Sequence, residues 1–545
     1  MSHLSSAAKY TGFDQLVRAF GQIVSKENVL TDEGITRYQQ NTLAIDTEIL
    51  MVLKVSSRYQ IPQILNVANQ HKIPLYPIST GNNWGYGCAT PVKPNSVIVD
   101  LSGLDRIIEF DAKHGIITIE PGVTQQKLYQ FLESQYDDSG IGYMVPTTGA
   151  GPSCSVLANA LERGFGITPI TDHAESITRI SAFLADGSLV TSALSELGAT
   201  RADALHKADI GPNFSSLLVQ SNLGIVVAMT IRLARKPDSS SAFIFHFSNR
   251  LSSGEIVETT RNLMQNYGSL ITAINLMNGP RMLSMLGGED TLERSEIEKQ
   301  CAGEGITYWT GMGTIQGDDT LVKVVKKKIK QQTQGKTDNI RFFHHRWIPS
   351  LEKLTASGLK KWVPNKWLRQ SEYLVQALKL LNGQPSQMAL PLAYLKNQHT
   401  SGDRTRTLNP GQDQCGLIWY APLVPMDDHI VLEFEQSFIS ICRDYGIAPY
   451  LTFSCLNAYC AEATIPILYD KEEEGAGEHA WQCYLSLFDM GKKLGCVPYR
   501  YNVRSMQIFD HRHSDHWRVI NSLKTCLDPH GIIAPGRYDG SNFRN

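Results

Sequence analysis

The sequence predicts a two-domain α+β protein. Three observations support this: a length of 545 residues, helical and strand patterns that alternate along the chain, and a serine-rich break at residues 238–242. A chain of this length exceeds what one hydrophobic core supports. The content of 42% apolar and 19% charged residues is that of an ordinary globular protein. We therefore expect a domain boundary, with a linker, at the break.

The part of the chain before the break is predicted to contain three helices and eight strands. Pro62 in a first turn and Thr124 as an N-cap are typical of helix starts, and Ala185-Asp186-Gly187 is typical of a hairpin turn. Apolar residues at helical spacing predict helices at residues 13–24, 61–70 and 124–135. Strands are expected at residues 49–55, 73–77, 96–101, 106–109, 115–120, 176–184, 188–191 and 224–234.

After the break, strand and helix patterns alternate again. A helix is predicted at Asp319–Gln332, because Val322, Val325 and Ile329 contribute to an apolar stripe. Its lysines are interpreted as a solvated face. Residues 397–413 are polar and contain Gly and Pro, which predicts a long loop.

Charge and composition exclude several classes of protein. A net charge of -2 argues against a nucleic-acid partner. The sequence has no run of eighteen apolar residues, so no membrane span is expected. Residues 1–21 lack the apolar segment of a signal peptide, and the ten cysteines form no CxxC pair. We therefore expect a cytoplasmic protein with reduced thiols.

Two histidine-bearing segments invite a functional interpretation. Residues 510–516 contain three histidines but no nearby cysteine, so a solvated loop is favoured over a metal site. The pair His344 and His345 is interpreted as a packing or surface feature, with a place in a substrate cavity as the alternative. No metal is expected.

A glycine-rich loop at residues 79–87 is the most informative segment. It follows a predicted strand and reads Ser-Thr-Gly-Asn-Asn-Trp-Gly-Tyr-Gly. Glycine lets backbone N–H groups approach an anion closely. No Lys follows the glycines, and the spacing is not GxGxxG, so neither a Walker loop nor a Rossmann fingerprint is present. A purely structural turn remains the alternative.

A second glycine-rich stretch, at residues 146–166, could face the same ligand. Together with it, several short motifs resemble the vanillyl-alcohol-oxidase/para-cresol-methylhydroxylase family of flavoproteins. These motifs are Gly85-Tyr86-Gly87, Asp100-Leu101, Glu120-Pro121-Gly122-Val123, Asn159-Ala160-Leu161-Glu162-Arg163-Gly164-Phe165-Gly166, Asn222-Leu223-Gly224-Ile225-Val226 and Ile533-Ala534-Pro535-Gly536-Arg537. Ala158 replaces the family's usual Gly. The resemblance runs from about Met51 to Tyr538.

The resemblance implies bound FAD and the family's two-domain fold. Residues 1–238, completed by residues 499–545, would bind FAD, and residues 239–498 would form a ferredoxin-like cap over the substrate. A homo-oligomer, with dioxygen or a protein as electron acceptor, is also implied. The cofactor-binding residues carried over are Ser79, Thr80, Gly81, Asn82, Asn83, Gly85, Tyr86, Gly87, Pro146, Gly149, Asn159, Gly164, Gly166, Gly224, Ile225 and Arg537.

The family oxidises para-substituted phenols, and the resemblance assigns four catalytic residues here. Tyr86, Tyr499 and Arg500 would hold the substrate oxygen as a phenolate, because Arg supplies positive charge and the hydroxyls supply hydrogen bonds. Asp172 would lie near the flavin N5 and accept a proton or activate water. The structural alternatives are ring packing for Tyr86, an ion pair for Arg500 and a turn cap for Asp172.

Two departures from the family pattern affect the expected chemistry. Leu417 and Asn409 stand where relatives carry the residue that links FAD covalently, so noncovalent FAD is predicted, with Cys88 or Cys154 as alternative anchors. Thr452 stands where some relatives have a cap carboxylate, so no such carboxylate is expected. A non-phenolic alcohol, a hydroxy acid or a natural product therefore remains an alternative substrate, and a non-catalytic flavin-binding protein an alternative function.

Overall fold

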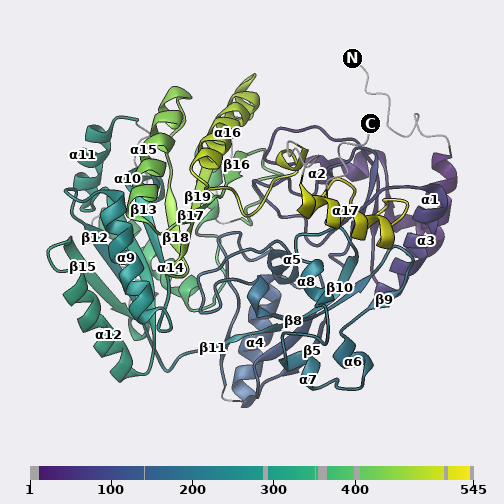
Figure 1. Cartoon of the computed structure of the whole chain (residues 1–545), viewed down its shortest axis with the longest axis horizontal. Helices are drawn as coiled ribbons and strands as arrows, with labels where there is room; N and C mark the ends of the chain where they lie inside the picture. Colours follow the sequence, from purple (N-terminus) through teal and green to yellow (C-terminus); the bar gives the residue numbers. More distant parts are fainter. Residues whose placement is uncertain are drawn as a thin grey trace.

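The computed structural model describes residues 12–139, 141–286, 292–349, 352–353, 365–397, 406–507 and 514–539. These residues form two lobes (Figure 1). One lobe contains both ends of the described chain, and the other contains the middle part, which we call the cap. No helix in the described ranges is long and apolar enough to cross a membrane.

The first sheet of the terminal lobe is mixed. Its strands, in spatial order, are β1 (Val29–Leu30), β2 (Ile49–Lys54), β4 (Ser96–Asp100) and β3 (Leu75–Ile78). The last three are parallel, and nearly all their side chains are buried, as is typical of parallel strands covered on both faces. Helix α1 (Phe13–Val24) buries Leu16 and Phe20 against this core, beside α3 (Ile61–His71).

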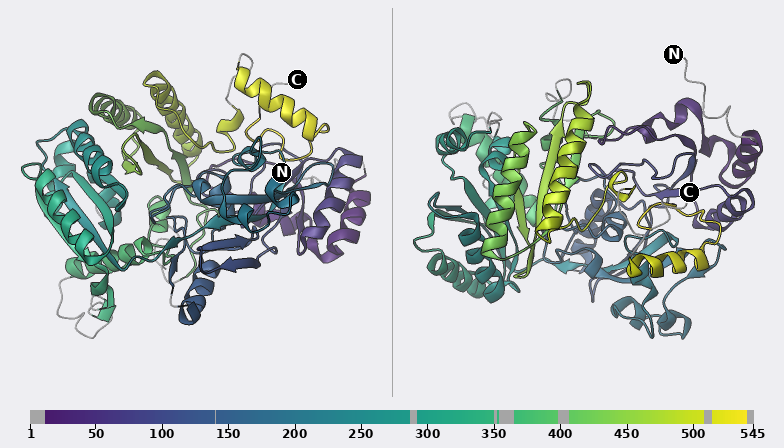
Figure 2. Two further views of the ribbon diagram at one scale, coloured as in Figure 1. Left: turned by 60° about the horizontal axis from the view of Figure 1, so that its bottom comes forward. Right: turned by 45° about the horizontal axis from the view of Figure 1, so that its top comes forward.

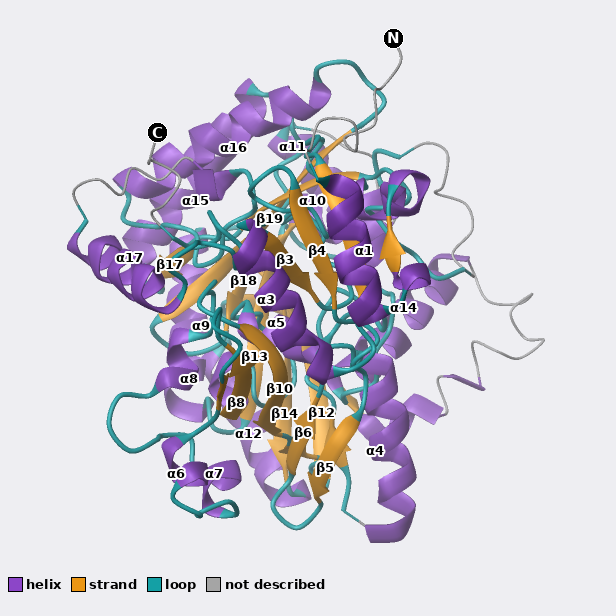
Figure 3. Ribbon diagram, turned by 90° about the vertical axis from the view of Figure 1, so that its right-hand side faces the viewer, coloured by secondary structure: helices purple, strands orange, loops and turns teal. Residues whose placement is uncertain are grey.

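The second sheet of this lobe is antiparallel and has its own hydrophobic core. Its strands, in spatial order, are β5 (Ile107–Asp111), β6 (Ile116–Ile119), β10 (Ile225–Arg232), β8 (Ile177–Phe183) and β9 (Leu189–Val190). The two sheets lie one above the other in Figure 3, with helix α4 (Gln125–Ser139) beside the lower one. The helices and strands predicted before residue 238 are thus confirmed, with small shifts at their ends.

Shorter elements connect these sheets. They are α2 (Thr36–Gln39), α5 (Val156–Leu161), α6 (Ala193–Glu196), α7 (Ala202–Leu205), α8 (Phe214–Leu217) and the strand pair β7 (Tyr143–Met144) and β11 (Ala234–Arg235).

The cap begins with a βαββαβ unit. Its elements are β12 (Ser239–Phe247), α9 (Ser253–Tyr267), β13 (Ile271–Asn278), β14 (Trp309–Gly317), α12 (Asp319–Gln332) and β15 (Thr337–His344). The strand order β15-β12-β14-β13, antiparallel throughout, is that of a ferredoxin-like unit, as the resemblance implied. The predicted helix at Asp319–Gln332 is confirmed.

The cap sheet continues beyond this unit to eight strands. The added strands are β18 (Thr452–Cys455), β19 (Cys460–Tyr469), β16 (Gly416–Tyr420) and β17 (Leu423–Pro425). The added helices are α10 (Gly279–Leu286), α11 (Arg294–Glu304), α14 (Asn365–Leu381), α15 (Asp428–Asp444) and α16 (Ala476–Lys493). Helices α9, α15 and α16 lie across one face of the sheet (Figures 1 and 2).

The expected linker at residues 238–242 is wrong, because β12 begins at Ser239. Ser240 and Ser241 are buried and pair with β14, and Ser241 also pairs with β15 on the other side. The Ser239 hydroxyl lies 3.1 Å from His344 Nε2 and the Ser240 hydroxyl donates to Asn382 Oδ1 at 3.2 Å. These partners are distant in sequence, so the serines looked like a loop when only their neighbours along the chain were considered.

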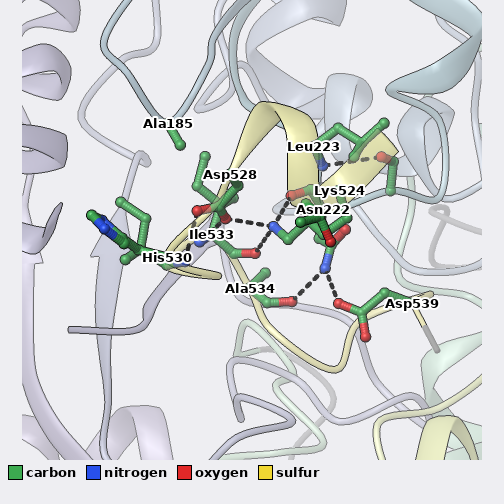
Figure 4. Close-up of polar contacts among 12 residues, drawn as sticks. Ala185, Asn222, Leu223, Lys524, Asp528, His530, Ile533, Ala534 and Asp539 are labelled. Atoms are coloured by element: carbon green, nitrogen blue, oxygen red, sulfur yellow. Dashed lines mark hydrogen bonds and ion pairs between the residues drawn. The ribbon is translucent and has the colours of Figure 1, made fainter. Parts of the chain in front are cut away.

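The C-terminal segment returns from the cap to the first sheet. Leu75 of β3 donates to Ile532 O and accepts from Ala534 N, both at 2.7 Å. Helix α17 (Asp515–Leu527) anchors this segment through Lys524, which donates to Asn222 O, Asp528 Oδ2 and Ile533 O, each at 2.7 Å (Figure 4). The last turns of the chain therefore complete the lobe that its first half builds.

Candidate active site

A cavity of about 540 Å³ lies between the two lobes. Its walls come from the two glycine-rich stretches, the C-terminal segment and the inner face of the cap sheet. Such a volume is in the range of ligand sites, which form preferentially between domains. Of the residues assigned to the cofactor, the cavity is lined by Ser79, Thr80, Gly81, Asn82, Asn83, Tyr86, Gly149, Asn159, Gly164, Gly166, Gly224 and Arg537.

The first glycine-rich loop offers free backbone donors to this cavity. Gly81 has a φ of 70°, a conformation that glycine adopts readily. The N–H groups of Thr80 to Asn83 have no hydrogen-bond partner in the described ranges. A run of unpaired amides around a left-handed residue forms a cradle for an anion. The loop therefore suits the pyrophosphate of FAD.

Gly85 and Gly87 serve the packing of this loop rather than the cavity wall. Both have positive φ, at 75° and 125°. A Cβ at Gly85 would overlap the ring of Trp419, and one at Gly87 would lie 2.6 Å from Val503 Cγ2. These glycines let the cap and the C-terminal segment pack directly on the loop.

The second glycine-rich stretch faces the cavity from the other side. Ser155 caps α5 by accepting from Ala158 N at 3.1 Å. After this helix come two glycines that lie against other side chains. A Cβ at Gly164 would overlap the side chain of Asn159, and a Cβ at Gly166 would overlap the side chain of His173. Pro146 and Ile225, also expected to bind the cofactor, do not line the cavity, although Gly224 and Val226 on either side of Ile225 do.

Two arginines share one carboxylate at the cavity wall. Glu162 makes ion pairs with Arg537 and with Arg500, whose Nε lies 3.4 Å from Glu162 Oε2. Arg537 also donates to Tyr76 Oη at 2.9 Å. Two cations and one anion leave net positive charge at this wall, which favours a negatively charged ligand.

Tyr86, Tyr499 and Arg500, which we call the tyrosine–arginine cluster, come together here. The guanidinium of Arg500 lies 4.2 Å from the centre of the Tyr86 ring and donates to Asn83 Oδ1 at 2.6 Å. Its Nε is buried without a hydrogen-bond partner among the described atoms. Burial raises the pKa of both tyrosines, which stay protonated donors at neutral pH. The cluster therefore brings neutral and charged hydrogen-bonding groups to one part of the cavity wall.

Glu462 joins this cluster, which contradicts the expectation that the cap supplies no carboxylate. Burial raises its pKa to about 7, against opposing effects of a hydrogen bond from Tyr499 and the charge of Arg500. A single charged residue, Glu462, in a strand of otherwise uncharged residues was the signal that could have identified it. Such a residue on a buried strand needs a polar partner or a polar cavity.

Strand alternation explains which cap residues reach the cavity. In the strand register, Asn275, Ser454 and Glu462 are neighbours in one row across β13, β18 and β19. All three line the cavity, whereas Ile274 and Leu276 lie in the hydrophobic core on the other face. The next row along the strands is Met277, Thr452 and Thr464, and it also lines the cavity.

The structure also shows where the residues considered for covalent attachment of FAD lie. Leu417 lines the cavity, whereas Asn409 accepts a hydrogen bond from Trp84 Nε1 at 3.3 Å. No histidine lines the cavity in the described part of the chain. Cys88 and Cys154 do line it, but burial raises the pKa of both thiols to about 12. Since the thiolate is the reactive form, neither is activated.

Asp172 lies outside the lining of the cavity. Its Oδ1 accepts from Ala174 N at 2.9 Å and Glu175 N at 3.3 Å, as a turn cap does. Burial raises its pKa. Its assignment as a proton acceptor therefore stays a prediction.

The histidine-bearing segments do not contribute to this site. His344 and His345 hydrogen-bond to Ser239 and Ser240 at the sheet edge and do not line the cavity. Of residues 510–516, only 514–516 are described, at the start of α17, and the rest lie outside the described residues. Within the described ranges no group of His, Cys, Asp and Glu could hold a metal ion.

Comparisons with known proteins agree with this site. The FAD binding domain family matches residues 49–193. The 1'-carboxy-chondrochloren decarboxylase of Chondromyces crocatus is 28% identical, over 96% of this chain and 97% of the relative. The flavoprotein subunit of 4-cresol dehydrogenase [hydroxylating] from Pseudomonas putida is 23% identical, over 96% and 95%. The structure of 4-ethylphenol oxidase from Gulosibacter chungangensis superimposes with a TM-score of 0.84 at 23% identity, over 99% and 98%.

The chain is therefore an FAD-dependent oxidoreductase with an FAD-binding domain and a cap. More specifically, the resemblance to the vanillyl-alcohol-oxidase/para-cresol-methylhydroxylase family is confirmed in sequence and in fold.

Proposed function

We propose that this enzyme oxidises a para-substituted phenol or aromatic alcohol at the carbon attached to the ring. The observation that carries the proposal is the tyrosine–arginine cluster, with the buried guanidinium of Arg500 beside two tyrosine hydroxyls, in the wall of the cavity. FAD bound along the two glycine-rich stretches would supply the hydride acceptor. The names of the relatives from P. putida and G. chungangensis, which refer to phenols, also support this substrate class.

The cluster matches what this oxidation demands of the substrate oxygen. Loss of hydride leaves an electron-deficient carbon, which the oxygen of a phenolate neutralises by forming a quinone methide. A phenol ionises near pH ~10 in water, and burial would raise its pKa further. Arg500 would offset this by its charge, while the hydroxyls of Tyr86 and Tyr499 would donate hydrogen bonds to the anion.

Glu462 would accept the proton that the phenol loses. Its pKa of about 7 is suited to a general base at neutral pH. Its hydrogen bond with Tyr499, which in turn bonds to Tyr86, would link it to the substrate hydroxyl. Asp172, which does not line the cavity, stays a predicted proton acceptor near the flavin N5.

The test is a substrate panel under anaerobic conditions, with loss of the flavin absorbance bands as the measurement. The panel contains 4-alkylphenols, 4-hydroxybenzyl alcohols, aliphatic alcohols and 2-hydroxy acids. We expect bleaching by the phenols. Bleaching by 2-hydroxy acids alone would replace the proposal with a hydroxy-acid dehydrogenase.

The natural electron acceptor is a separate question. We propose either dioxygen or a partner protein, and hydrogen peroxide yield against reduction of an acceptor dye distinguishes them. The cytoplasmic location and the homo-oligomeric state stay predictions, which fractionation and light scattering would test.

A further inference from the structure

Arg281 is a second cation in the cavity, apart from the tyrosine–arginine cluster. It lies in the first turn of α10, which begins directly after β13 ends. Asn278 Oδ1 accepts from the Arg281 backbone N–H at 3.1 Å and so fixes the start of the helix. The Arg281 side chain lines the cavity.

No acidic residue compensates Arg281 within the described ranges. Arg500 and Arg537 share Glu162, but Arg281 makes no ion pair. Its guanidinium donates from Nη1 to Ser284 Oγ at 3.1 Å. The groups that act electrostatically on it are the phenol hydroxyls of Tyr373 and Tyr450, and burial lowers its pKa.

A buried cation without a counter-charge is costly unless something else supplies the negative charge. The guanidinium has five N–H donors in one plane, and the structure uses Nη1 for Ser284. A carboxylate matches the remaining donors with two parallel hydrogen bonds. The ligand is the natural source of that group, because Arg281 faces the cavity.

The strand register places Arg281 away from Glu462. Asn275 shares a row with Glu462, and Met277 lies two residues further along β13, a step of about 7 Å. Arg281 follows beyond the end of that strand. Met285, four residues after Arg281 on α10, also lines the cavity. The uncharged row of Met277, Thr452 and Thr464 therefore lies between the two ends.

We propose that Arg281 binds a carboxylate carried on the para substituent of the substrate, with the phenol oxygen at the tyrosine–arginine cluster. This inference rests on the proposed function for the phenol end, but the carboxylate end can be tested alone. The substrate would then be an elongated molecule with an aromatic hydroxyl at one end and an anionic tail at the other. The name of the C. crocatus relative, which refers to a carboxy compound, is consistent with such a substrate.

The probes are ω-(4-hydroxyphenyl)alkanoates with two to five methylene groups, each compared with its methyl ester. Binding is measured anaerobically by perturbation of the flavin spectrum, or by reduction where it occurs. The wild-type holoenzyme should bind at least one acid about tenfold to a hundredfold more tightly than its ester, the range for a charge-assisted contact. Absence of this preference at every length overturns the proposal.

The variants are Arg281→Met and Arg281→Lys, with Arg341→Met on the exposed part of β15 as a matched control. The acid-to-ester ratio should fall to about one in Arg281→Met, stay intermediate in Arg281→Lys and keep its wild-type value in the control. FAD content reports folding of each variant. A ratio that survives in Arg281→Met overturns the proposal.

The two proposals fail in different ways. If acids bind in preference to esters but no phenol bleaches the flavin, the carboxylate site stands and the phenol chemistry falls. If phenols bleach the flavin without any preference for acids, the phenol chemistry stands and the role of Arg281 falls.

Discussion

Replacing Arg500 with alanine is expected to slow flavin reduction by a phenolic substrate far more than it weakens FAD binding. The Arg500 guanidinium lies over Tyr86 and lines the cavity that would hold the substrate. Its contacts with the first glycine-rich loop are this ring contact and a hydrogen bond to Asn83 Oδ1, and neither involves the backbone N–H groups of Thr80 to Asn83 that would face the pyrophosphate. Glu162 keeps Arg537 as an ion-pair partner in the variant, so no buried carboxylate is left alone.

The expected loss in the rate of flavin reduction follows from the charges at the site. A unit charge about 4 Å from a phenolate, at an effective dielectric constant of about 20, contributes about 4 kcal/mol. Glu162, 3.4 Å from Arg500, offsets part of this. A net effect of about 3 kcal/mol corresponds to about a hundredfold loss in rate. Arg500→Lys keeps the charge but not the planar donors, so a loss of about tenfold is expected.

The assay is anaerobic stopped-flow reduction with the best 4-alkylphenol of the panel. FAD content, from absorbance and protein concentration, is the control for folding and cofactor binding. Tyr86→Phe and Tyr499→Phe should each show smaller losses than Arg500→Ala. Their combination with it should be less than additive, because all three act on one oxygen. Reduction of Arg500→Ala at the wild-type rate would refute the reasoning.

Three further predictions concern ionisation, cofactor linkage and stability. Burial raises the pKa of Glu462 from 4.5 to about 7, so its contribution to folding stability is fully present below pH 4.5 and lost as pH rises through 7. Glu462→Gln should therefore be more stable than wild type by about 3 kcal/mol at pH 8 but by less than about 1 kcal/mol at pH 5, and equal differences in urea unfolding would contradict this. Acid precipitation should leave FAD in the supernatant, whereas a yellow pellet would disprove noncovalent binding and point to Cys88 or Cys154. Lys524→Met should lose about 3 kcal/mol of unfolding free energy, because it leaves Asp528 without its buried cation. The control Lys492→Met, exposed on α16, should lose much less, and similar losses would contradict the anchoring role.

The parts of the fold that depend on local pattern were predictable from the sequence. The parallel strands are apolar except at their ends, and the Ser79–Gly81 turn follows one of them, so strand and loop were both recognisable. The serines at the start of β12 were not, because their partners are His344, His345 and Asn382, about a hundred or more residues away. The local composition of residues 238–242 is typical of a linker, but pairing with distant parts of the chain makes this segment the start of a strand.

Part of the candidate site was likewise predictable from the sequence, and part was not. Tyr86, Tyr499 and Arg500 belong to motifs that could be recognised, and the structure brings them together. Glu462 and Arg281 belong to no motif. Glu462 reaches the cavity because of the register of β19 against β18, and Arg281 because α10 starts where β13 ends. Both facts depend on how the cap sheet is assembled from distant segments, which local sequence patterns do not reveal.

The most direct test of the central claim, oxidation of a substrate bound as phenolate, compares one 4-alkylphenol with its methyl ether. The ether has the same ring and the same reacting carbon, but its oxygen cannot ionise. Anaerobic flavin reduction by the two compounds is measured in the wild-type holoenzyme at saturating concentration. We predict that the phenol reduces the flavin at least about a hundredfold faster than the ether. This ratio corresponds to the stabilisation of the phenolate that the ether cannot receive. Reduction by the ether within about threefold of the phenol's rate would contradict the account.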